Sequence, residues 1–353
     1  MQEIKDGKQN IHNQDVHCSV DSQTSSATNS VFASALNSVE PQLTKLNQNL
    51  TSYLPTASKT SQKMIDHLFG TEGKRIRPAL FFLSARLFDY AGKHLYPIAA
   101  VCEFVHTASL LHDDVVDNSP LRRNKPTAHT LWGDESAILV GDLIYARASE
   151  MMAETECNEI VKGFAQSIRH MSEGELLQLE HIYNAKTTIT DYLTICRCKT
   201  AALISMSCKA AGLLAGATPE HCRDIEEFGQ AVGLAFQLVD DALDFIQQSA
   251  DMGKPTLADI QDGKITLPIL LLKECMTHSE TAKLNSLIEA SHIDQDALTW
   301  ILESVSNYGT VQASLERAQE YSQQAIRSLR KLPNNQARHE LEALVERLVW
   351  RTQ

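Results

Sequence analysis

An all-α fold is predicted by three features of the 353-residue sequence. Apolar residues recur at helical spacing through most of the chain, and no segment sustains the alternation of a strand. Alanine and leucine dominate, while aromatic residues make up only 6% of the chain. Hydrophobic residues make up 43%, which is enough for a substantial core. Because the breaks in the pattern are short, we expect one large bundle of long helices.

The helical domain is expected over residues 31–353, behind a disordered tail over residues 1–30. That tail is rich in Ser, Thr, Asn, Gln and Asp and poor in large apolar residues. It is not rich in arginine, which argues against a mitochondrial transit peptide. Helical periodicity begins near Val31.

Gly, Pro and polar residues interrupt the helical pattern at five places. These are residues 70–73, 92–93, 120–133, 185–188 and 216–220. At the last break, Thr218 is a candidate N-cap and Pro219 a first helical residue, with acidic residues behind them. A long helix is therefore expected from Pro219, and three shorter amphipathic helices are expected beyond Asp294.

A first cluster of three carboxylates lies in an otherwise apolar helix, at Leu110 to Asp117. Asp113 and Asp117 are one turn apart on one face, with Asp114 beside them. Since like charges repel and acidic side chains are seldom buried alone, a cation should complete this site. Mg²⁺ held by one or two carboxylates and by phosphate oxygens fits the arrangement. A solvated acidic face is the alternative.

The same DDxxD spacing recurs at Asp240, Asp241 and Asp244, again between apolar flanks. If both helices face one cavity, six carboxylates can hold several Mg²⁺ ions around one diphosphate. Two solvated faces that share the pattern by chance remain the alternative.

Basic residues lie close to these clusters, although the formal net charge is −12. Such an acidic chain argues against a nucleic-acid partner. Lys74 and Arg77 are at or near the start of a helix over 78–87, where a cation opposes the helix dipole unless an anion binds there. Arg122 and Arg123 follow the first cluster, and guanidinium groups suit bidentate phosphate contacts. A solvated basic turn is the alternative for the first pair.

The eight cysteines form no CxxC pair and no Cys/His zinc spacing. We expect them to be reduced core thiols of a cytoplasmic protein. No apolar run approaches the ~18 residues of a transmembrane helix, and the N-terminus lacks a signal-peptide core. Any membrane contact is therefore expected to be peripheral.

With these residues assembled, the chain resembles the trans-isoprenyl diphosphate synthases, and most closely the octaprenyl-like long-chain enzymes of bacteria. The similarity covers about residues 35–351. Eight segments carry it in order: GKRIRP (73–78), HTASLLHDDVVD (106–117), LRRNKPTAH (121–129), GDLIYARA (141–148), GELLQ (174–178), KTA (199–201), FQLVDDALDF (236–245) and GKPTLADIQDGKITLP (253–268). The resemblance implies a helical bundle around a deep central cavity, and a homodimer.

The resemblance also implies a role for each candidate residue. The isopentenyl diphosphate site would consist of Lys74, Arg77, His106 and Arg123, and Arg122 would contact the allylic diphosphate. Three Mg²⁺ ions would be bound directly by Asp113, Asp117 and Asp240, with Asp114, Asp241 and Asp244 behind them. The allylic diphosphate and the nascent carbocation would be surrounded by Lys199, Thr200, Gln237 and Lys254. His106 could instead be an ordinary core histidine, and Lys199 a snorkelling surface lysine.

The implied reaction is a Mg²⁺-dependent head-to-tail condensation of isopentenyl diphosphate with an allylic diphosphate such as farnesyl diphosphate. An octaprenyl-like product for a quinone side chain is expected, because the residues before the first cluster, Ala108, Ser109, Val105 and Cys102, are small or medium. A synthase with a shorter product is the alternative. A terpene cyclase would lack the second DDxxD, and a non-catalytic partner subunit would usually have lost aspartates.

Two positions depart from the family pattern. Asn124 and Leu257 stand where family members commonly have glycine. Asparagine tolerates left-handed backbone geometry, whereas leucine would cost about 1–2 kcal/mol if the position needs a positive φ. Leu257 lies within residues 251–264, which are rich in glycine and charge and which we expect to form a mobile lid.

Overall fold

The fold is known from a computed structural model that describes residues 37–70, 75–122, 125–250, 257–290 and 293–349. The predicted tail over residues 1–30 lies outside these ranges, so the tail and the start of the domain stay predictions. Within the ranges the all-α prediction is confirmed, because the two strands comprise only two residues each.

The first half of the described chain contains α2 (Glu40–Asn49), the 3₁₀ turn η1 (Leu50–Tyr53), α3 (Lys59–Phe69), α4 (Ile76–Leu87), α5 (Leu95–Val116), β1 (Leu121–Arg122), β2 (Lys125–Pro126), α6 (Ala128–Trp132), α7 (Asp134–Ala153) and α8 (Asn158–His181). The second half contains α9 (Ile189–Cys196), the π-helical turn η2 (Arg197–Ala201), α10 (Ala202–Leu214), α11 (Pro219–Ala250), α12 (Ala258–Gln261), α13 (Leu267–Cys275), α14 (His278–Glu289), α15 (Gln295–Asn307), α16 (Thr310–Leu329) and α17 (Gln336–Val349).

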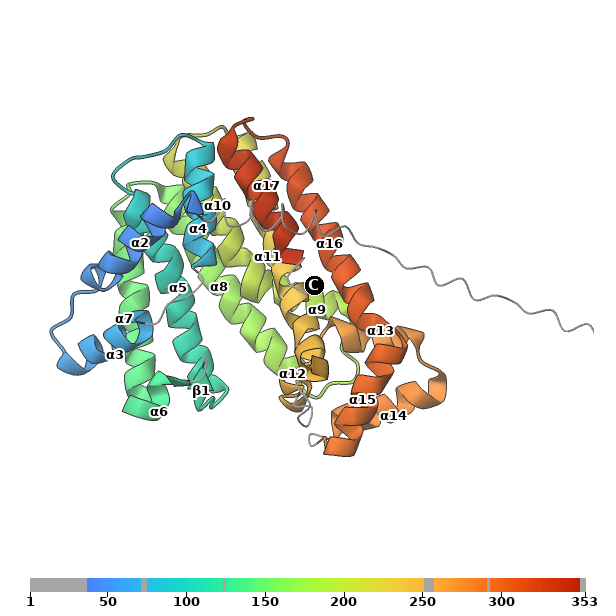
Figure 1. Cartoon of the computed structure of the whole chain (residues 1–353). Helices are drawn as coiled ribbons and strands as arrows, with labels where there is room; N and C mark the ends of the chain where they lie inside the picture. Colours follow the sequence, from blue (N-terminus) through green and yellow to red (C-terminus); the bar gives the residue numbers. More distant parts are fainter. Residues whose placement is uncertain (1–36, 71–74, 123–124, 251–256, 291–292, 350–353) are drawn as a thin grey trace, which may run out of the picture.

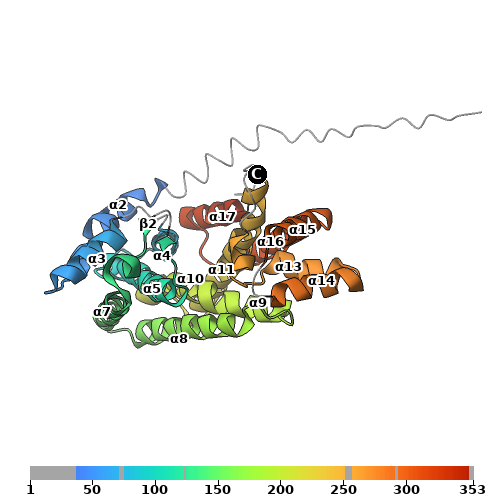
Figure 2. The same cartoon turned by 90° about the horizontal axis from the view of Figure 1, so that it is seen from below.

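The long helices form one bundle, with α2 and α3 at one edge and α13 to α15 at the other (Figures 1 and 2). Helix α11 packs mainly on α16 and α10, and α5 packs on α7 and α4. One cluster of buried apolar side chains joins α2 to α8 with α10 and the first half of α11. A second cluster joins the second half of α11 to α9 and to α12 through α16. No described helix is long and apolar enough to cross a bilayer.

Helix α11 begins where the sequence predicts. Pro219 is its first residue, and the Thr218 hydroxyl accepts a hydrogen bond of 3.1 Å from the backbone N–H of His221. Three helices follow Asp294, as predicted, although α16 is long at 20 residues. Helix α4 starts two residues before Pro78, because first-turn N–H groups have no intrahelical partner and proline is tolerated there.

The predicted break over residues 120–133 is not a plain loop. It contains the antiparallel hairpin of β1 and β2, and then the short helix α6. The hairpin is too short for the alternation of its side chains to appear as a sequence pattern.

The described cysteines are all free, as predicted. Four are buried and behave as core thiols: Cys102, Cys196, Cys208 and Cys222. The core assignment is wrong for Cys275, which is exposed at the end of α13, and only partly right for Cys157 and Cys198. Cys18 lies outside the described residues.

Two glycines of α11 allow η2 and α10 to approach it closely. A Cβ at Gly233 would lie 2.5 Å from Ala201 Cα, and a Cβ at Gly229 would lie 2.6 Å from Ser205 Cα. Both distances are far shorter than a van der Waals contact, so the approach requires glycine. It brings η2 against α11 about two turns before the second aspartate cluster.

Gly233→Ala is expected to destabilise the fold by roughly 1–2 kcal/mol. Overpacking against backbone costs about 1–3 kcal/mol, which exceeds the gain of about 1 kcal/mol in helix propensity. Thermal denaturation would measure the loss. Gly212→Ala is the control, since the added Cβ would lie 3.3 Å from Phe88 Cε2 and should leave the melting temperature unchanged or higher. Equal melting temperatures for the two variants would contradict the prediction.

Candidate active site

The first aspartate cluster lies at the C-terminal end of α5, where β1 follows. Asp114 is buried, Arg122 Nε donates to its Oδ1 at 2.8 Å, and Arg122 Nη2 forms an ion pair with the same oxygen at 2.7 Å. Arg122 thus binds a carboxylate of the cluster itself, a contact that the sequence did not predict. Asp117 caps the helix and is exposed.

Asp113 faces α8 and η2. Burial and the nearby Glu175 raise the pKa of Asp113 to about 7, although Lys199 and Arg122 oppose the rise. A carboxyl group with these neighbours gains from a further cation.

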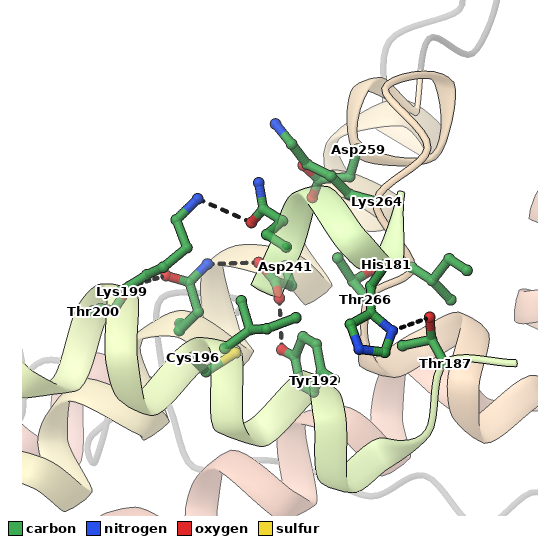
Figure 3. Close-up of a pocket in the computed structure, with 14 residues that line it drawn as sticks. His181, Thr187, Tyr192, Cys196, Lys199, Thr200, Asp241, Asp259, Lys264 and Thr266 are labelled. Carbon is green, nitrogen blue, oxygen red and sulfur yellow. Dashed lines mark hydrogen bonds between the residues drawn. The ribbon is translucent and has the colours of Figure 1, made fainter. Parts of the chain in front are cut away.

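The second cluster lies in the second half of α11. Asp241 is buried, and both of its oxygens accept hydrogen bonds, from Tyr192 Oη at 2.5 Å and from Gln237 Nε2 at 2.8 Å (Figure 3). Burial raises the pKa of Asp241 to about 7, and the nearby Asp259 adds to the rise. The two hydrogen bonds from Tyr192 and Gln237 fix the position of the Asp241 carboxylate.

Asp244 connects α11 to the segment that follows it. The backbone N–H groups of Ala258 and Asp259, at the start of α12, donate to its carboxylate, while burial raises its pKa. Asp244 Oδ2 is buried and has no hydrogen-bond partner among the described residues. A buried carboxylate oxygen in this state suits a bound cation.

Lys264 lies near the first cluster and at the pocket. Its Nζ lies 3.8 Å from Asp117 Oδ2 of the first cluster and 3.4 Å from Asp262 Oδ2. Lys264 also lines a pocket of about 240 Å³ together with Asp241 and Asp259 (Figure 3). Lys264 therefore lies between Asp117 of the first cluster and the pocket that Asp241 of the second cluster lines, and a single site shared by both clusters stays a prediction.

Lys199 and Thr200 enter the same pocket from η2. Such π turns are rare and recur at functional sites. Lys199 forms an ion pair with Glu175 of α8 and donates to Gln178 Oε1 at 3.0 Å. Gly174 permits this contact, since a Cβ there would lie 2.8 Å from Lys199 Cγ. Lys199 is therefore an anchored residue of the site rather than a snorkelling surface lysine.

Gln237 lies on α11 opposite η2. Thr200 Oγ1 donates to Gln237 Oε1 at 2.6 Å, and both residues line the pocket. The structure thus brings together three of the four residues that were predicted around the allylic diphosphate. The fourth, Lys254, lies outside the described residues.

The predicted isopentenyl diphosphate site is described only in part, because Lys74 and Arg123 lie outside the described residues. Arg77 is in the first turn of α4, and its Nε is buried with no hydrogen-bond partner in the described part of the chain. Burial lowers the pKa of Arg77, although Glu103 opposes this. A buried guanidinium donor without a partner suits a bound anion. His106 is half-buried on α5.

Arg75, the remaining cation of the GKRIRP segment, has a structural role. Its Nη1 lies 2.5 Å from Glu103 Oε2, and both side chains are buried. Arg75 therefore stabilises the packing of α4 on α5 and is not available to a substrate.

The aspartates suit Mg²⁺ that is completed by a substrate. Within the described ranges, no three His, Cys, Asp or Glu side chains converge closely enough to hold a metal ion by themselves. Mg²⁺ usually takes one or two carboxylates and fills its other positions with waters and phosphate oxygens. The buried, partnerless oxygen of Asp244 and the raised pKa of Asp113 fit such an ion.

Leu257 has the left-handed geometry that was in question, with φ of 39° at the N-cap of α12. The strain is about 1–2 kcal/mol. Its side chain is fully buried in the second core cluster, which contributes about 1.5–3 kcal/mol. Burial therefore offsets the strain, and α12 keeps its place at the pocket. Residues 251–256 of the expected lid, and Asn124, lie outside the described residues.

Four residues of the site were missed by the sequence analysis: Glu175, Tyr192, Asp259 and Lys264. Three of them lie in the segments GELLQ and GKPTLADIQDGKITLP, which carried the resemblance and could have revealed them. No local sequence pattern pointed to Tyr192, because its hydrogen-bond partner Asp241 is 49 residues away in the sequence.

Comparisons with known proteins identify the family of this chain. The profile of the family Polyprenyl synthetase matches residues 58–305. The octaprenyl diphosphate synthase of Escherichia coli (strain K12) is 37% identical over 279 residues, which cover 79% of this chain and 86% of that protein.

Two solved structures have the same fold. A decaprenyl diphosphate synthase from Rhodobacter capsulatus is similar with a TM-score of 0.86 and 33% identity, over 91% of this chain and 99% of that one. A polyprenyl synthase from Caulobacter crescentus CB15, complexed with calcium and isoprenyl diphosphate, gives 0.84 and 33%, over 91% and 98%. The predicted family is confirmed: the chain belongs to the polyprenyl synthetase family of prenyltransferases and is a polyprenyl diphosphate synthase.

Proposed function

We propose that this synthase condenses isopentenyl diphosphate with an allylic diphosphate such as farnesyl diphosphate, requires Mg²⁺, and makes a long, octaprenyl-like product for a quinone side chain. The observation that carries the proposal is the position of Lys264, which lines the pocket with Asp241 of the second cluster and lies 3.8 Å from Asp117 of the first. The octaprenyl and decaprenyl products in the names of its relatives support a long chain.

The residue roles in this proposal are those the sequence predicted, with Lys264 added from the structure. Mg²⁺, three ions per site, would be bound by Asp113, Asp117 and Asp240, supported by Asp114, Asp241 and Asp244. When bound, Mg²⁺ would supply Lewis-acid stabilisation of the leaving diphosphate. Isopentenyl diphosphate would be bound by Lys74, Arg77, His106 and Arg123.

Around the allylic substrate, positive side chains would stabilise the negative charge of the diphosphate. Lys199, Lys254, Lys264 and Arg122 would stabilise the charge that develops on the diphosphate as its bond to the allylic carbon breaks. The double bond of isopentenyl diphosphate then attacks the allylic cation. A proton is lost to the released diphosphate, which leaves a chain longer by one isoprene unit. Thr200 and Gln237 would face the cation, and the buried walls would exclude water that could quench it.

A homodimer in the cytoplasm is part of the proposal. The neighbouring helices α7 and α8 expose large apolar side chains: Ile138, Leu139, Val161, Leu176 and Leu179. Exposed apolar surface of this kind suits a subunit interface. Light scattering on the purified chain tests the dimer. The free cysteines of the described residues suit a reducing compartment.

The direct test is an assay with radiolabelled isopentenyl diphosphate and farnesyl diphosphate. Long prenyl products should form with Mg²⁺, disappear in excess chelator and return when Mg²⁺ is restored, because the diphosphate leaves poorly without a metal. Activity that survives the chelator would contradict the metal requirement. Products of geranylgeranyl length would support the shorter-chain alternative, and no reaction at all would support a non-catalytic partner subunit.

A further inference from the structure

A continuous chain of hydrogen bonds joins α9 to α11 and returns to η2. Tyr192 Oη donates to Asp241 Oδ2 at 2.5 Å, Gln237 Nε2 donates to Asp241 Oδ1 at 2.8 Å, and Thr200 Oγ1 donates to Gln237 Oε1 at 2.6 Å (Figure 3). All four side chains line the pocket. Two of them, Thr200 and Gln237, are the residues proposed to face the allylic cation.

Each hydrogen bond in this series has a defined donor and acceptor, and the order is set by Asp241, which accepts at both of its oxygens. Both oxygens of Asp241 accept hydrogen bonds, one from the Tyr192 hydroxyl and one from the side-chain amide nitrogen of Gln237, so the amide of Gln237 has one orientation. The amide oxygen of Gln237 then points to Thr200 and accepts a hydrogen bond from its hydroxyl group. The orientation of the two residues at the reacting end thus follows from the placement of one buried carboxylate.

Tyr192 donates to one oxygen of this carboxylate, and Gln237 donates to the other. Both Tyr192 and Asp241 are buried, at 5% and 6% exposed. Tyr192 stands on α9, which continues directly into η2, so its hydroxyl also ties the turn that bears Thr200 to α11.

We propose that Tyr192 is a positioning residue of the condensation reaction: by holding Asp241, it sets the orientation of Gln237 and Thr200 toward the allylic cation. The inference rests on the proposed function. Tyr192 itself need not touch a substrate.

Tyr192→Phe tests the proposal, because it removes the hydroxyl and keeps the ring. A lost hydrogen bond to a charged group should lower kcat about tenfold or more. The KM for isopentenyl diphosphate should change less than about twofold, since the variant leaves the binding residues of that substrate in place. A general loosening of the fold would instead raise KM values and lower the melting temperature.

The decisive measurement is a double-mutant cycle with Thr200→Val. If Tyr192 acts through Gln237 and Thr200, the double variant should be no slower than the slower single variant, because both changes break one chain. Losses in kcat that multiply would overturn the proposal, and so would a Tyr192→Phe enzyme with the wild-type kcat. If Tyr192→Phe does not fold, Tyr192→Met replaces it in the cycle, because it also removes the hydroxyl donor to Asp241.

Tyr308→Phe is the matched control. Tyr308 also donates to a carboxylate, Glu280 Oε2 at 2.9 Å, but it lies at the surface between α15 and α16. This variant should keep the wild-type kcat. The wild-type rate in the same assay tests the proposed function by itself, so a failure of that function is distinguishable from a failure of the role of Tyr192.

Discussion

Ala108→Tyr is expected to change the product from a long chain to C15 or C20 while the enzyme still consumes both substrates. A chain that grows from the first aspartate cluster would run back along α5, over Ala108 and Ser109, then Val105 and then Cys102. Ala108, Val105 and Cys102 are fully buried. A tyrosine at Ala108 has no route to solvent and must occupy space that a close-packed interior does not yield easily. Chromatography of the dephosphorylated alcohols gives the product lengths.

Ala325→Tyr is the control for this experiment. Ala325 is equally buried and belongs to the same core cluster, but it lies on α16 rather than α5. Overpacking there costs a similar free energy, about 1–3 kcal/mol, and should leave the product length unchanged. If both variants shorten the product, a loosened core is the cause. An unchanged product from an active Ala108→Tyr enzyme would show that the chain does not grow along this face of α5.

Features of the fold that depend on neighbouring residues were predictable from the sequence. Thr218 and Pro219 mark the start of α11 because an N-cap and a first-turn proline act within one helical turn. The DDxxD spacing placed Asp113 and Asp117 one turn apart for the same reason. The resemblance then supplied an expectation that periodicity could not, namely that the two distant clusters serve one site.

Features that depend on tertiary contacts were not predictable in this way. Arg122 was assigned to a substrate from its position beside the first cluster, yet in the structure it binds Asp114. Its role toward the allylic diphosphate stays a proposal. The contact of Lys264 with Asp117 joins segments far apart in the chain, and no local pattern encodes it. The strain of the positive φ at Leu257 is offset by the burial of its side chain, which is a tertiary contact.

Removing one carboxylate from each cluster, in the double variant Asp113→Ala and Asp240→Ala, should abolish the stabilisation of the protein by Mg²⁺ and diphosphate. In the wild-type protein, burial raises the pKa of Asp113 from 3.8 to about 7. Because the pKa is raised on folding, ionising this group costs stability as the pH rises from about 4 to about 7. A bound divalent ion would offset that cost. Binding to the folded state alone adds about 2.7 kcal/mol when the ligand exceeds its Kd a hundredfold.

The melting temperature near neutral pH should therefore rise more with Mg²⁺ and diphosphate together than with either alone, by about 4 °C in the wild-type protein. The double variant should show no such rise. Each single variant should lose about a hundredfold or more in kcat, since the several kcal/mol of transition-state stabilisation from a metal depends on its ligands. Asp296→Ala, at an exposed aspartate in the first turn of α15, should keep both the rise and the rate. An equal rise in melting temperature in the double variant and the wild type would contradict the prediction. The two clusters would then contribute nothing to the affinity for Mg²⁺, so the ions would bind elsewhere.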